Sequence, residues 1–542
     1  MQKRAIIHVE NTENVLELAE YLTSANWTIL SANKTEDLLK RENIPVVHEP
    51  AIVENNQYVN DASQLIHKIL LTKPEQPYNF EGSETEENNI FLLCMNITPE
   101  ISTPSAAKPM DSLLRPSNFV ISSVIRAAFA NQSNVLILTD PADYKEAIIQ
   151  LKTNNIQKEF RIYLAAKAMN QISAYDAGLA ASILQSPEYG VTFLNNLTYP
   201  YKKDIELHHG ANPQQKGYLY KTPDGNGTLN GFLKLQGKDL TYSIVSDISY
   251  AWERVSTLYD LLKNQYSVKS TNCDGYDFTT QFTPLTGTVF TIAVKFNAIV
   301  GAALSTNVTD SFKLTYKYDT ANITDVILAC SAVIDGTAAA EIIKGNFVAI
   351  IAPSFTVEAK QILSENKNIR LIPSAKVTRS PYDGKLINGG LILQTKDATL
   401  FDHWKVRTKN RPSQFKTDEM AFGMLLAMGA HSYSAILIKN NAIVGIAQGC
   451  TSVNRAMMVV YQDALLHQER TKSESPEMDN SLGDVLICDA TIPFDEPVKK
   501  LLDSGITAII QTGGTPADNE FTNYCDERGI VMVFTDMAHI SF

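Results

Sequence analysis

The feature that most constrains the fold is a regular alternation of strand-like and helix-like patterns in the first part of the chain. Arg4–Val9 is apolar and β-prone, Thr12–Ser24 has helical apolar spacing, Trp27–Ser31 is again strand-like, Glu36–Arg41 is helical, and Ile44–Val47 is a short strand. A βαβα rhythm of this kind is typical of parallel strands with helices packed on the sheet. We therefore predict an α/β protein that begins with a small doubly wound parallel sheet.

The alternation continues through the buried strands Ile90–Met95 and Val135–Thr139 and breaks around Ser186–Lys203. We place a domain boundary there, which gives domains 1–199 and 200–542. The second region is again α/β, and it could comprise two similar halves, although the sequence indicates this only weakly. Its clearest strands are Val289–Val294, Asp325–Cys330, Phe347–Ile351, Ala435–Ile438, Ile443–Ala447, Val485–Cys488, Ala508–Gln511 and Val531–Phe534.

Composition narrows the class of protein. A chain of 542 residues with 44% hydrophobic and 20% charged residues has enough apolar material for several cores. Its net charge of -12 argues against nonspecific binding to nucleic acid or to an anionic membrane. The six cysteines form no C-x-x-C pair, so we expect neither a disulfide framework nor a zinc site. With no secretory leader and no membrane-spanning run, we expect a cytoplasmic protein.

Three stretches resemble motifs of one enzyme family. Leu207–Gln215 (LHHGANPQQ) is similar to L-R-Y-G-x-N-P-H-Q, and Leu235–Trp252 (LQGKDLTYSIVSDISYAW) is similar to L-Q-G-K-x-L-S-Y-N-N-x-x-D-x-x-A-A. Near the C-terminus, Ser504–Gly514 (SGITAIIQTGG) and Asp526–Met537 (DERGIVMVFTDM) resemble A-G-I-T-A-V-I-Q-P-G-G and D-E-H-G-I-A-M-V-F-T-G-M. The family is the bifunctional purine-biosynthesis (PurH) family, which joins AICAR formyltransferase to IMP cyclohydrolase. Weaker matches extend the resemblance over nearly the whole chain.

The resemblance implies a fold, an assembly and a set of ligands. It implies an N-terminal methylglyoxal-synthase-like sheet, followed by a formyltransferase region of two cytidine-deaminase-like α/β subdomains without zinc. It implies a homodimer that is intertwined through the second region. The implied ligands are the nucleotides AICAR, FAICAR and IMP, with 10-formyltetrahydrofolate as the cofactor and no metal ion.

Formyl transfer needs a base that accepts the amine proton and a donor that polarises the formyl oxygen. The family's K-H-x-N-P-C-G aligns with Lys295–Gly301 (KFNAIVG), so Lys295 is retained, while Phe296 replaces the histidine and Ala298 the asparagine. Lys295 is thus the one retained catalytic candidate, and a strand-end lysine that faces solvent is the alternative. Loss of a general base typically costs ~10²–10⁴ in rate.

The nucleotide-binding positions are mixed. Gly210, Asn212 and Gln215 are retained and are substrate-binding candidates by resemblance, whereas His208 and His209 replace the family's arginine and tyrosine. A histidine pair could bind a phosphate or a metal ion, but no third metal ligand is identifiable.

Two further formyltransferase motifs are altered. Asn322–Val326 aligns with the family's S-A-F-G-G loop, and Asp325 and Val326 replace its two glycines. The added side chains hinder close approach of the backbone to a ligand. In the family's S-D-A-F-F-P-F motif, Thr491 replaces the first phenylalanine and Ile492 the second. Pro493 and the last phenylalanine, Phe494, are retained and are substrate-binding candidates.

The cyclohydrolase motifs are altered as well. The family's S-V-S-D-K-T-G turn aligns with His8–Asn14, which lacks the lysine that would neutralise a phosphate. Lys34 is a candidate phosphate ligand at a helix N-terminus, although a solvated lysine is the simpler interpretation. The other positions that lose a charged or hydroxylated group are Gln64, Thr98, Asn118 and Ala130.

Three functional interpretations remain open. The chain could be an enzyme in which Lys295 polarises the formyl group and Asn212 and Gln215 position the nucleotide. It could instead be a noncatalytic nucleotide-binding or dimerising paralogue, or a structural relic without a ligand. Because strand cores and turn glycines are retained while the positions that contact phosphate, folate and protons are not, we favour the noncatalytic paralogue.

Overall fold

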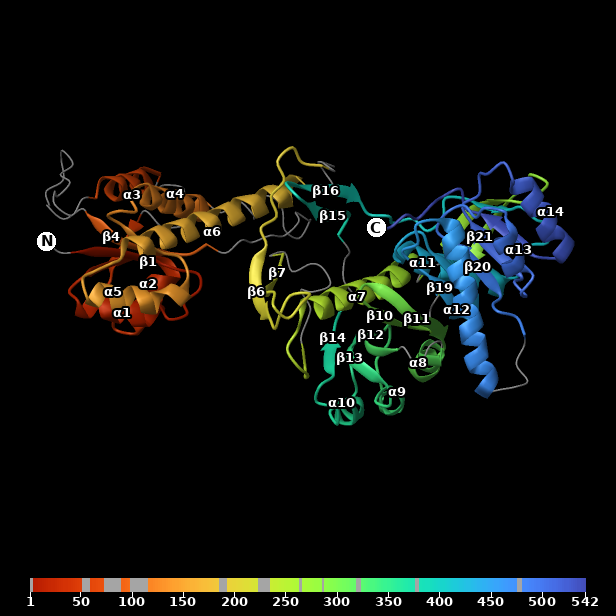
Figure 1. The fold of residues 1–542 in the computed structure, drawn as a ribbon. Helices are drawn as coiled ribbons and strands as arrows, with labels where there is room; N and C mark the ends of the chain where they lie inside the picture. The colour runs from red at the N-terminus through yellow and green to blue at the C-terminus, as the bar shows by residue number, and fades with distance from the viewer. Residues whose placement is uncertain are drawn as a thin grey trace. The chain divides into compact units, whose positions relative to one another are not determined.

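The computed structural model describes residues 3–50, 59–72, 89–97, 116–184, 193–222, 234–262, 266–284, 287–317, 323–375, 380–474 and 480–542 (Figure 1). Contacts divide the chain into two compact units, residues 1–202 with a short return segment from Tyr220, and residues 203–219 with 225–542. Asn322, the polar loop over 81–88, and Thr98 of the aligned cyclohydrolase positions lie outside the described residues.

The first unit is built on a five-stranded parallel sheet in the order β3-β2-β1-β4-β5. The predicted parallel sheet is therefore confirmed. Its strands are β1 (Arg4–His8), β2 (Thr28–Ser31), β3 (Val47–His48), β4 (Ile90–Met95) and β5 (Leu136–Leu138).

One strand begins later than the sequence indicates. Ile44–Val47 was expected to be a strand, but only Val47 belongs to β3. The amide of Ile44 instead donates to the carbonyl of Leu39 at 2.9 Å, and its side chain is buried. The apolar character of Ile44 therefore reflects the packing that closes the preceding helix.

Helices cover both faces of this sheet, as a doubly wound arrangement requires. Alternate residues of β1 point to opposite sides, with Ala5 and Ile7 in one core and Ile6 in the other. The first core is covered by α1 (Val15–Ser24), α2 (Asn33–Arg41) and α5 (Tyr144–Lys152), and the second by α3 (Val59–Leu71), α4 (Pro116–Ala130) and α6 (Lys158–Leu184).

The second unit contains a mixed sheet of thirteen strands, in the order β14-β13-β12-β10-β11-β19-β18-β20-β21-β22-β17-β8-β9. Strands β8 and β9 form a hairpin that pairs through β17 with the end of the sheet. The bounds are β8 (Tyr266–Thr271), β9 (Asp277–Phe282), β10 (Val289–Lys295), β11 (Ala298–Ser305), β12 (Thr324–Cys330), β13 (Asn346–Ala352), β14 (Arg370–Pro373), β17 (Trp404–Val406), β18 (Ala435–Lys439), β19 (Ala442–Ala447), β20 (Val485–Cys488), β21 (Ala508–Gln511) and β22 (Val531–Phe534).

Ten of these strands form two halves with the same topology. Each half starts with an antiparallel hairpin, β10–β11 in the first half and β18–β19 in the second. The first strand of the hairpin also pairs antiparallel with a third strand, β12 or β20. Two further strands then add in parallel, β13 and β14 or β21 and β22. The halves meet where β11 pairs with β19, at Ala303 and Ala442. The matching helices are α7 (Tyr242–Leu262), α8 (Val308–Lys317), α9 (Gly336–Ile342) and α10 (Val357–Leu363), and then α11 (Gln414–Gly429), α12 (Val453–Glu474), α13 (Glu496–Leu502) and α14 (Asp518–Arg528). The two similar halves that the sequence indicated weakly are therefore present.

The two central hairpins share a sequence as well as a shape. Lys295–Gly301 reads KFNAIVG, and Lys439–Gly445 reads KNNAIVG. Each glycine lies under the helix that follows its hairpin. A Cβ on Gly301 would lie 2.7 Å from the carbonyl oxygen of Thr315, and one on Gly445 would lie 3.0 Å from that of Val460. The repeated motif therefore encodes the packing of a hairpin against a helix.

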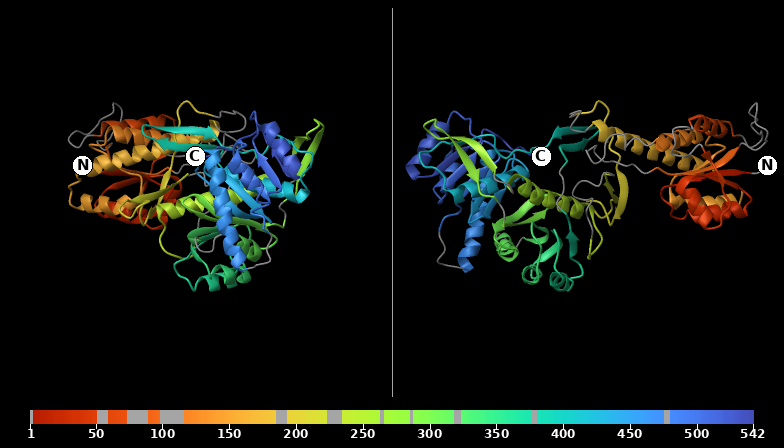
Figure 2. Two further views of the ribbon diagram at one scale, coloured as in Figure 1. Left: turned by 45° about the vertical axis from the view of Figure 1, so that its right-hand side comes forward. Right: turned by 180° about the vertical axis from the view of Figure 1, so that it is seen from behind.

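The large sheet is covered on both faces (Figure 2). Helices α7 and α11 pack on one face in a core that is continuous across both halves, where Phe290 meets Phe422 edge-on at 5.8 Å between ring centroids. The other face carries α8, α9 and α10 in the first half and α12, α13 and α14 in the second.

Two small hairpins lie outside the large sheet. They are β6 (Lys202–Leu207) with β7 (Gly217–Lys221), and β15 (Tyr382–Ile387) with β16 (Gly390–Thr395). No helix among the described residues is long and apolar enough to cross a membrane.

Candidate functional site

The retained lysine lies beside the turn of the first repeated hairpin. Phe296 and Asn297 form the two-residue turn between β10 and β11, and both have the left-handed backbone conformation, with φ of 54° and 55°. The Lys295 ammonium donates to the carbonyl oxygen of Thr324 at 2.9 Å, and the Phe296 side chain is 73% exposed. Lys295 is thus half-buried and hydrogen-bonded, and does not point freely into solvent.

A buried carboxylate on α7 holds this turn. Asp247 accepts the backbone N–H of Phe296 at 3.0 Å and that of Asn297 at 2.6 Å. Burial raises the pKa of Asp247, although these two hydrogen bonds and the charge of Lys295 act in the opposite direction. Sequence reasoning assigned Asp247 no role. Its place in the retained LQGKDLTYSIVSD stretch was the available signal.

The start of β12 lies next to Lys295. Asp325 has φ of 56°, a conformation that glycine adopts far more readily. Its carboxylate accepts the side-chain amide of Asn346 at 3.2 Å. The loop therefore keeps a glycine-like backbone shape but carries a negative charge.

Gly210, Asn212 and Gln215 are brought together in one tight turn. The Gly210 N–H donates to the Gln215 carbonyl at 2.7 Å, and the Asn212 N–H donates to Gln215 Oε1 at 2.8 Å. A Cβ on Gly210 would lie 2.6 Å from that of Gln215. The Tyr242 N–H donates to the His209 carbonyl at 3.2 Å, which ties this turn to the start of α7. The retained side chains therefore bind one another.

The two histidines of this turn stack edge to face, with ring centroids 5.2 Å apart. His209 Nδ1 lies 2.8 Å from the carbonyl oxygen of Gly210. Within the part of the chain that the structure describes, no group of three or more histidine, cysteine, aspartate or glutamate side chains could hold a metal ion.

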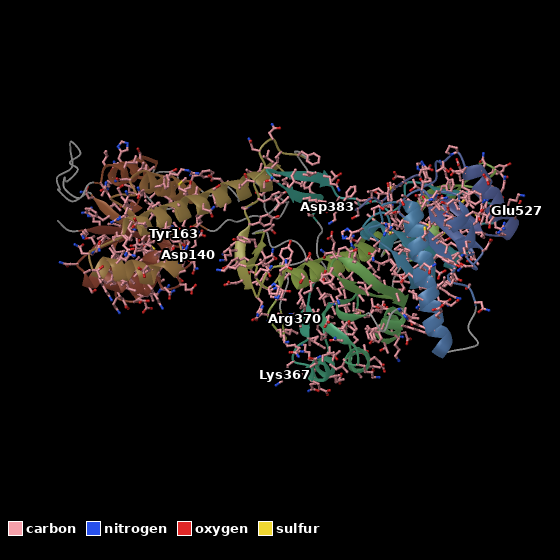
Figure 3. All side chains as sticks on the ribbon, in the orientation of Figure 1. Asp140, Tyr163, Lys367, Arg370, Asp383 and Glu527 are labelled. Carbon is pink, nitrogen blue, oxygen red and sulfur yellow. The ribbon has the colours of Figure 1, made fainter. Side chains whose placement is uncertain are left out.

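The well-retained LQGK stretch has a structural role. Gln236 donates to the carbonyl oxygens of Leu363 and Ile369 at 3.2 and 3.3 Å. Gly237 has φ of 103°, and a Cβ there would lie 2.6 Å from the Ile369 oxygen. Arg370, labelled in Figure 3, donates to the Asp239 carbonyl through Nε at 3.1 Å. These contacts fasten the stretch to β14.

The second half contains a buried aspartate that sequence reasoning also missed. Asp489 is inaccessible to solvent and accepts the Ser432 hydroxyl at 2.6 Å and the Ser434 N–H at 3.0 Å. Burial raises the pKa of Asp489. Its carbonyl accepts the N–H of His539, whose ring Nδ1 lies 2.6 Å from Asp397. These contacts anchor the C-terminal segment.

Phe494 packs as a core side chain of the same half. Its ring stacks on Phe521 at 4.8 Å and meets Tyr524 edge-on at 5.3 Å, and the Lys499 ammonium lies 4.7 Å from its centroid. Pro493 precedes it and is half-buried. The retention of Phe494 is thus accounted for by packing.

At the carboxyl edge of the N-terminal sheet, where α/β proteins bind ligands, two backbone donors are already engaged. The N–H groups of Glu10 and Asn11 donate to Asn96 Oδ1 at 2.7 and 3.2 Å. Lys34 lies exposed in the first turn of α2, whose N-cap residue, Ala32, provides no side-chain cap. Lys34 belongs to the first unit, whereas the formyltransferase candidates belong to the second.

The remaining aligned cyclohydrolase positions are structural or exposed. The amide of Asn118 donates to the Tyr175 hydroxyl at 3.2 Å in the core. Arg126 pairs with Asp176 along neighbouring helices. Gln64 is exposed on α3, and Ala130 ends α4.

Comparison with known proteins decides the family. The family model described as AICARFT/IMPCHase bienzyme matches residues 128–461. The bifunctional purine biosynthesis protein PurH of Clostridium acetobutylicum is 30% identical over 551 residues, which cover 99% of each chain. This chain belongs to the AICARFT/IMPCHase bienzyme family.

Other members of the family are similarly distant. PurH of Clostridium perfringens is 29% identical over 545 residues, and PurH of Clostridium botulinum is 28% identical over 549 residues, again with 99% of each chain covered. A solved structure, the crystal structure of ForH, matches 34% of this chain at 21% identity with a TM-score of 0.28, which is too low to bear on the fold.

Within this family member, the structure brings together some of the predicted residues. Asp247 and the turn with Gly210, Asn212 and Gln215 are linked through α7, and Asp247 in turn holds the hairpin turn beside Lys295. Phe494 belongs to the core of the other half, and Lys34 to the other unit.

Proposed function

We propose that this chain is a noncatalytic member of the AICARFT/IMPCHase bienzyme family that has lost formyl transfer and ring closure. One observation carries the proposal. At the β10–β11 turn, Phe296 stands where the family motif has histidine, and a phenyl ring cannot accept a proton. The carboxylate of Asp325 stands where the motif has glycine. These residues do not suit transfer of a formyl group from 10-formyltetrahydrofolate.

The internal repeat supports a structural reason for the retained lysine. Lys439 occupies the equivalent position in the second hairpin, and its ammonium donates to the Ser481 carbonyl at 3.1 Å and to the Ser481 hydroxyl at 2.7 Å. Lys295 bonds the Thr324 carbonyl in the same manner. A lysine that fastens the end of a strand in both halves needs no catalytic role.

The second candidate function is the family's own pair of reactions, AICAR formyl transfer and conversion of FAICAR to IMP. One observation favours it. Asp247 lies near Lys295 with a raised pKa, which is a property of catalytic bases. Against it, both carboxylate oxygens accept backbone N–H groups, and the residue is only 6% exposed. A carboxylate that is buried and holds a backbone N–H on each oxygen is poorly placed to reach a substrate.

The finer features of the fold also belong to this proposal. We assign the first unit to the methylglyoxal-synthase-like type and each half of the large sheet to the cytidine-deaminase-like type. Nucleotide binding, the domain limits at 199 and 200, and a cytoplasmic location stay predictions.

The formyltransferase assay tests the proposal directly. With AICAR and 10-formyltetrahydrofolate, the chain should give no turnover, because loss of a base alone typically costs ~10²–10⁴ in rate. Phe296→His alone should not rescue it, because a base acts only on a substrate held at about 3 Å. The Clostridium perfringens relative serves as the positive control. Turnover by the unmodified chain that Lys295→Ala abolishes would establish the enzyme instead.

We further propose that the chain forms a homodimer. The β15–β16 hairpin exposes aliphatic side chains on both of its faces, with Leu386 84% exposed on one face and Ile392 55% exposed on the other, as expected of an arm that a second copy covers. Light scattering should give twice the mass of the chain, and Leu386→Lys with Ile392→Lys should shift the protein toward monomer. Val357→Lys, at an aliphatic residue on α10 that is 71% exposed, is the matched control. A stable monomer of the unmodified chain at micromolar concentration would contradict the proposal.

A further inference from the structure

A hollow of about 290 Å³ lies at the amino edge of the N-terminal sheet, opposite the edge that carries Lys34. It opens where β1, β2, β4 and β5 begin. Its lining includes Lys3, Trp27, Phe91, Asn134, Asn155 and Arg161.

The charge of this hollow is unusual for an acidic protein. The chain has a net charge of -12, yet the described residues of the lining include two cations and no carboxylate. Arg161 is the clearest sign of a missing partner. Its Nη1 atom is buried and has no hydrogen-bond partner among the described residues, and burial lowers the pKa of its guanidinium. A desolvated cation that lacks an anion is costly unless a ligand supplies one.

Arginine is also the side chain best suited to bind a phosphate, since its planar fork presents paired donors. The wall beside it is aromatic. The Lys3 ammonium lies 5.5 Å from the Trp27 ring centroid, and Phe91 lies on the same lining. Aromatic faces stack on planar rings, and the asparagine amides offer donors and acceptors to polar ring substituents.

We propose that this hollow binds a phosphate monoester of a compound with a single planar ring system, of the size of a mononucleotide. The phosphate lies against Arg161 and Lys3, and the ring lies against Trp27 and Phe91. The volume is at the lower end of ligand pockets, which start near ~300 Å³, so a dinucleotide does not fit. The site is separate from the carboxyl edge and does not depend on whether the family's reactions persist.

Tryptophan fluorescence provides a local readout. The chain has three tryptophans, of which Trp252 and Trp404 are 2% and 0% exposed in the second unit, whereas Trp27 is half-buried in the hollow. AMP should change the Trp27 emission in a saturable manner. Inorganic phosphate and adenosine should each bind at least about tenfold more weakly than AMP. Phosphate lacks the contacts of the ring with Trp27 and Phe91, and adenosine lacks the contacts of the phosphate with Arg161 and Lys3. Phosphate that binds as tightly as AMP, or no saturable change with AMP, would overturn the proposal.

Variants of Arg161 identify the site. Arg161→Gln should weaken AMP binding by about tenfold or more, and Arg161→Lys should restore part of it. Lys158 is an exposed cation on the same helix and does not line the hollow. Lys158→Gln should therefore bind AMP as tightly as the unmodified chain does. Without a ligand, Arg161→Gln should keep or raise the thermal midpoint, because it removes a partly buried charge whose Nη1 atom has no partner among the described residues. A clearly lower midpoint would make Arg161 a structural residue and would contradict the proposal.

Discussion

Given FAICAR, the purified chain is expected to form no IMP above the uncatalysed rate. Ring closure needs a cradle for the phosphate and polar groups around the formamide. At the carboxyl edge of the N-terminal sheet, the N–H groups of Glu10 and Asn11 are bound to Asn96, and the Asn118 amide is bound to Tyr175. Enzymes ordinarily turn over at about 1–10³ per second, so the expected deficit is many orders of magnitude.

The absorbance of IMP makes this measurement continuous. The PurH protein of Clostridium perfringens, at the same concentration, is the matched control for substrate quality. A turnover near one per second by this chain, typical of an ordinary enzyme, would show that the replaced side chains are not needed for ring closure.

The second large effect concerns the turn beside Lys295. Asp247→Ala is expected to lower the free energy of unfolding by about 2–4 kcal/mol, because two backbone N–H groups lose their acceptor. Asp247→Asn keeps one acceptor oxygen, so its free energy of unfolding should fall by about half as much as that of Asp247→Ala. Urea unfolding measures both variants. If Asp247→Ala were as stable as the unmodified chain, the turn would not depend on this carboxylate.

The difference in unfolding free energy between the unmodified chain and Asp247→Asn should depend on pH. The folded-state pKa of Asp247 is raised by burial, so its contribution to stability is fully present below the unfolded pKa of about 3.9 and decreases as pH rises through the folded pKa. The amide that replaces the carboxyl group in Asp247→Asn does not titrate. The stability difference between the two proteins should therefore narrow as the pH is raised from about 4 toward neutrality, and a difference that widened would contradict the sign of this shift.

Much of the fold could be predicted because buried strands leave a local record. Val485–Cys488 and Val531–Phe534 are short apolar runs with β-branched residues, and the structure places both inside the large sheet as β20 and β22. Ile44 shows the limit, since an apolar residue at a helix end and one in a strand have the same local signature. The KFNAIVG and KNNAIVG stretches are both visible in the sequence, but only the shared topology of the two halves shows that they form equivalent hairpins.

The site was less predictable because its key contacts join distant parts of the chain. Asp247 meets Phe296 across an interval of 49 residues, and Ser432 meets Asp489 across 57. Periodicity carries no information about such pairs. The retention of Lys295 and Phe494 was visible in the sequence, but their hydrogen bonds and ring contacts were needed to separate a structural role from a catalytic one.

Binding of AICAR to the unmodified chain separates the noncatalytic protein from the enzyme, because binding requires no chemistry. By titration calorimetry at micromolar protein, we expect no heat of binding at the formyltransferase positions. Asn212 and Gln215 are bonded to each other there, and His208 and His209 replace the family's arginine and tyrosine. Binding to the Arg161 hollow is separated by repeating the titration with Arg161→Gln. Tight AICAR binding that survives Arg161→Gln would show that the formyltransferase positions still hold the nucleotide, and would make the enzyme the first interpretation.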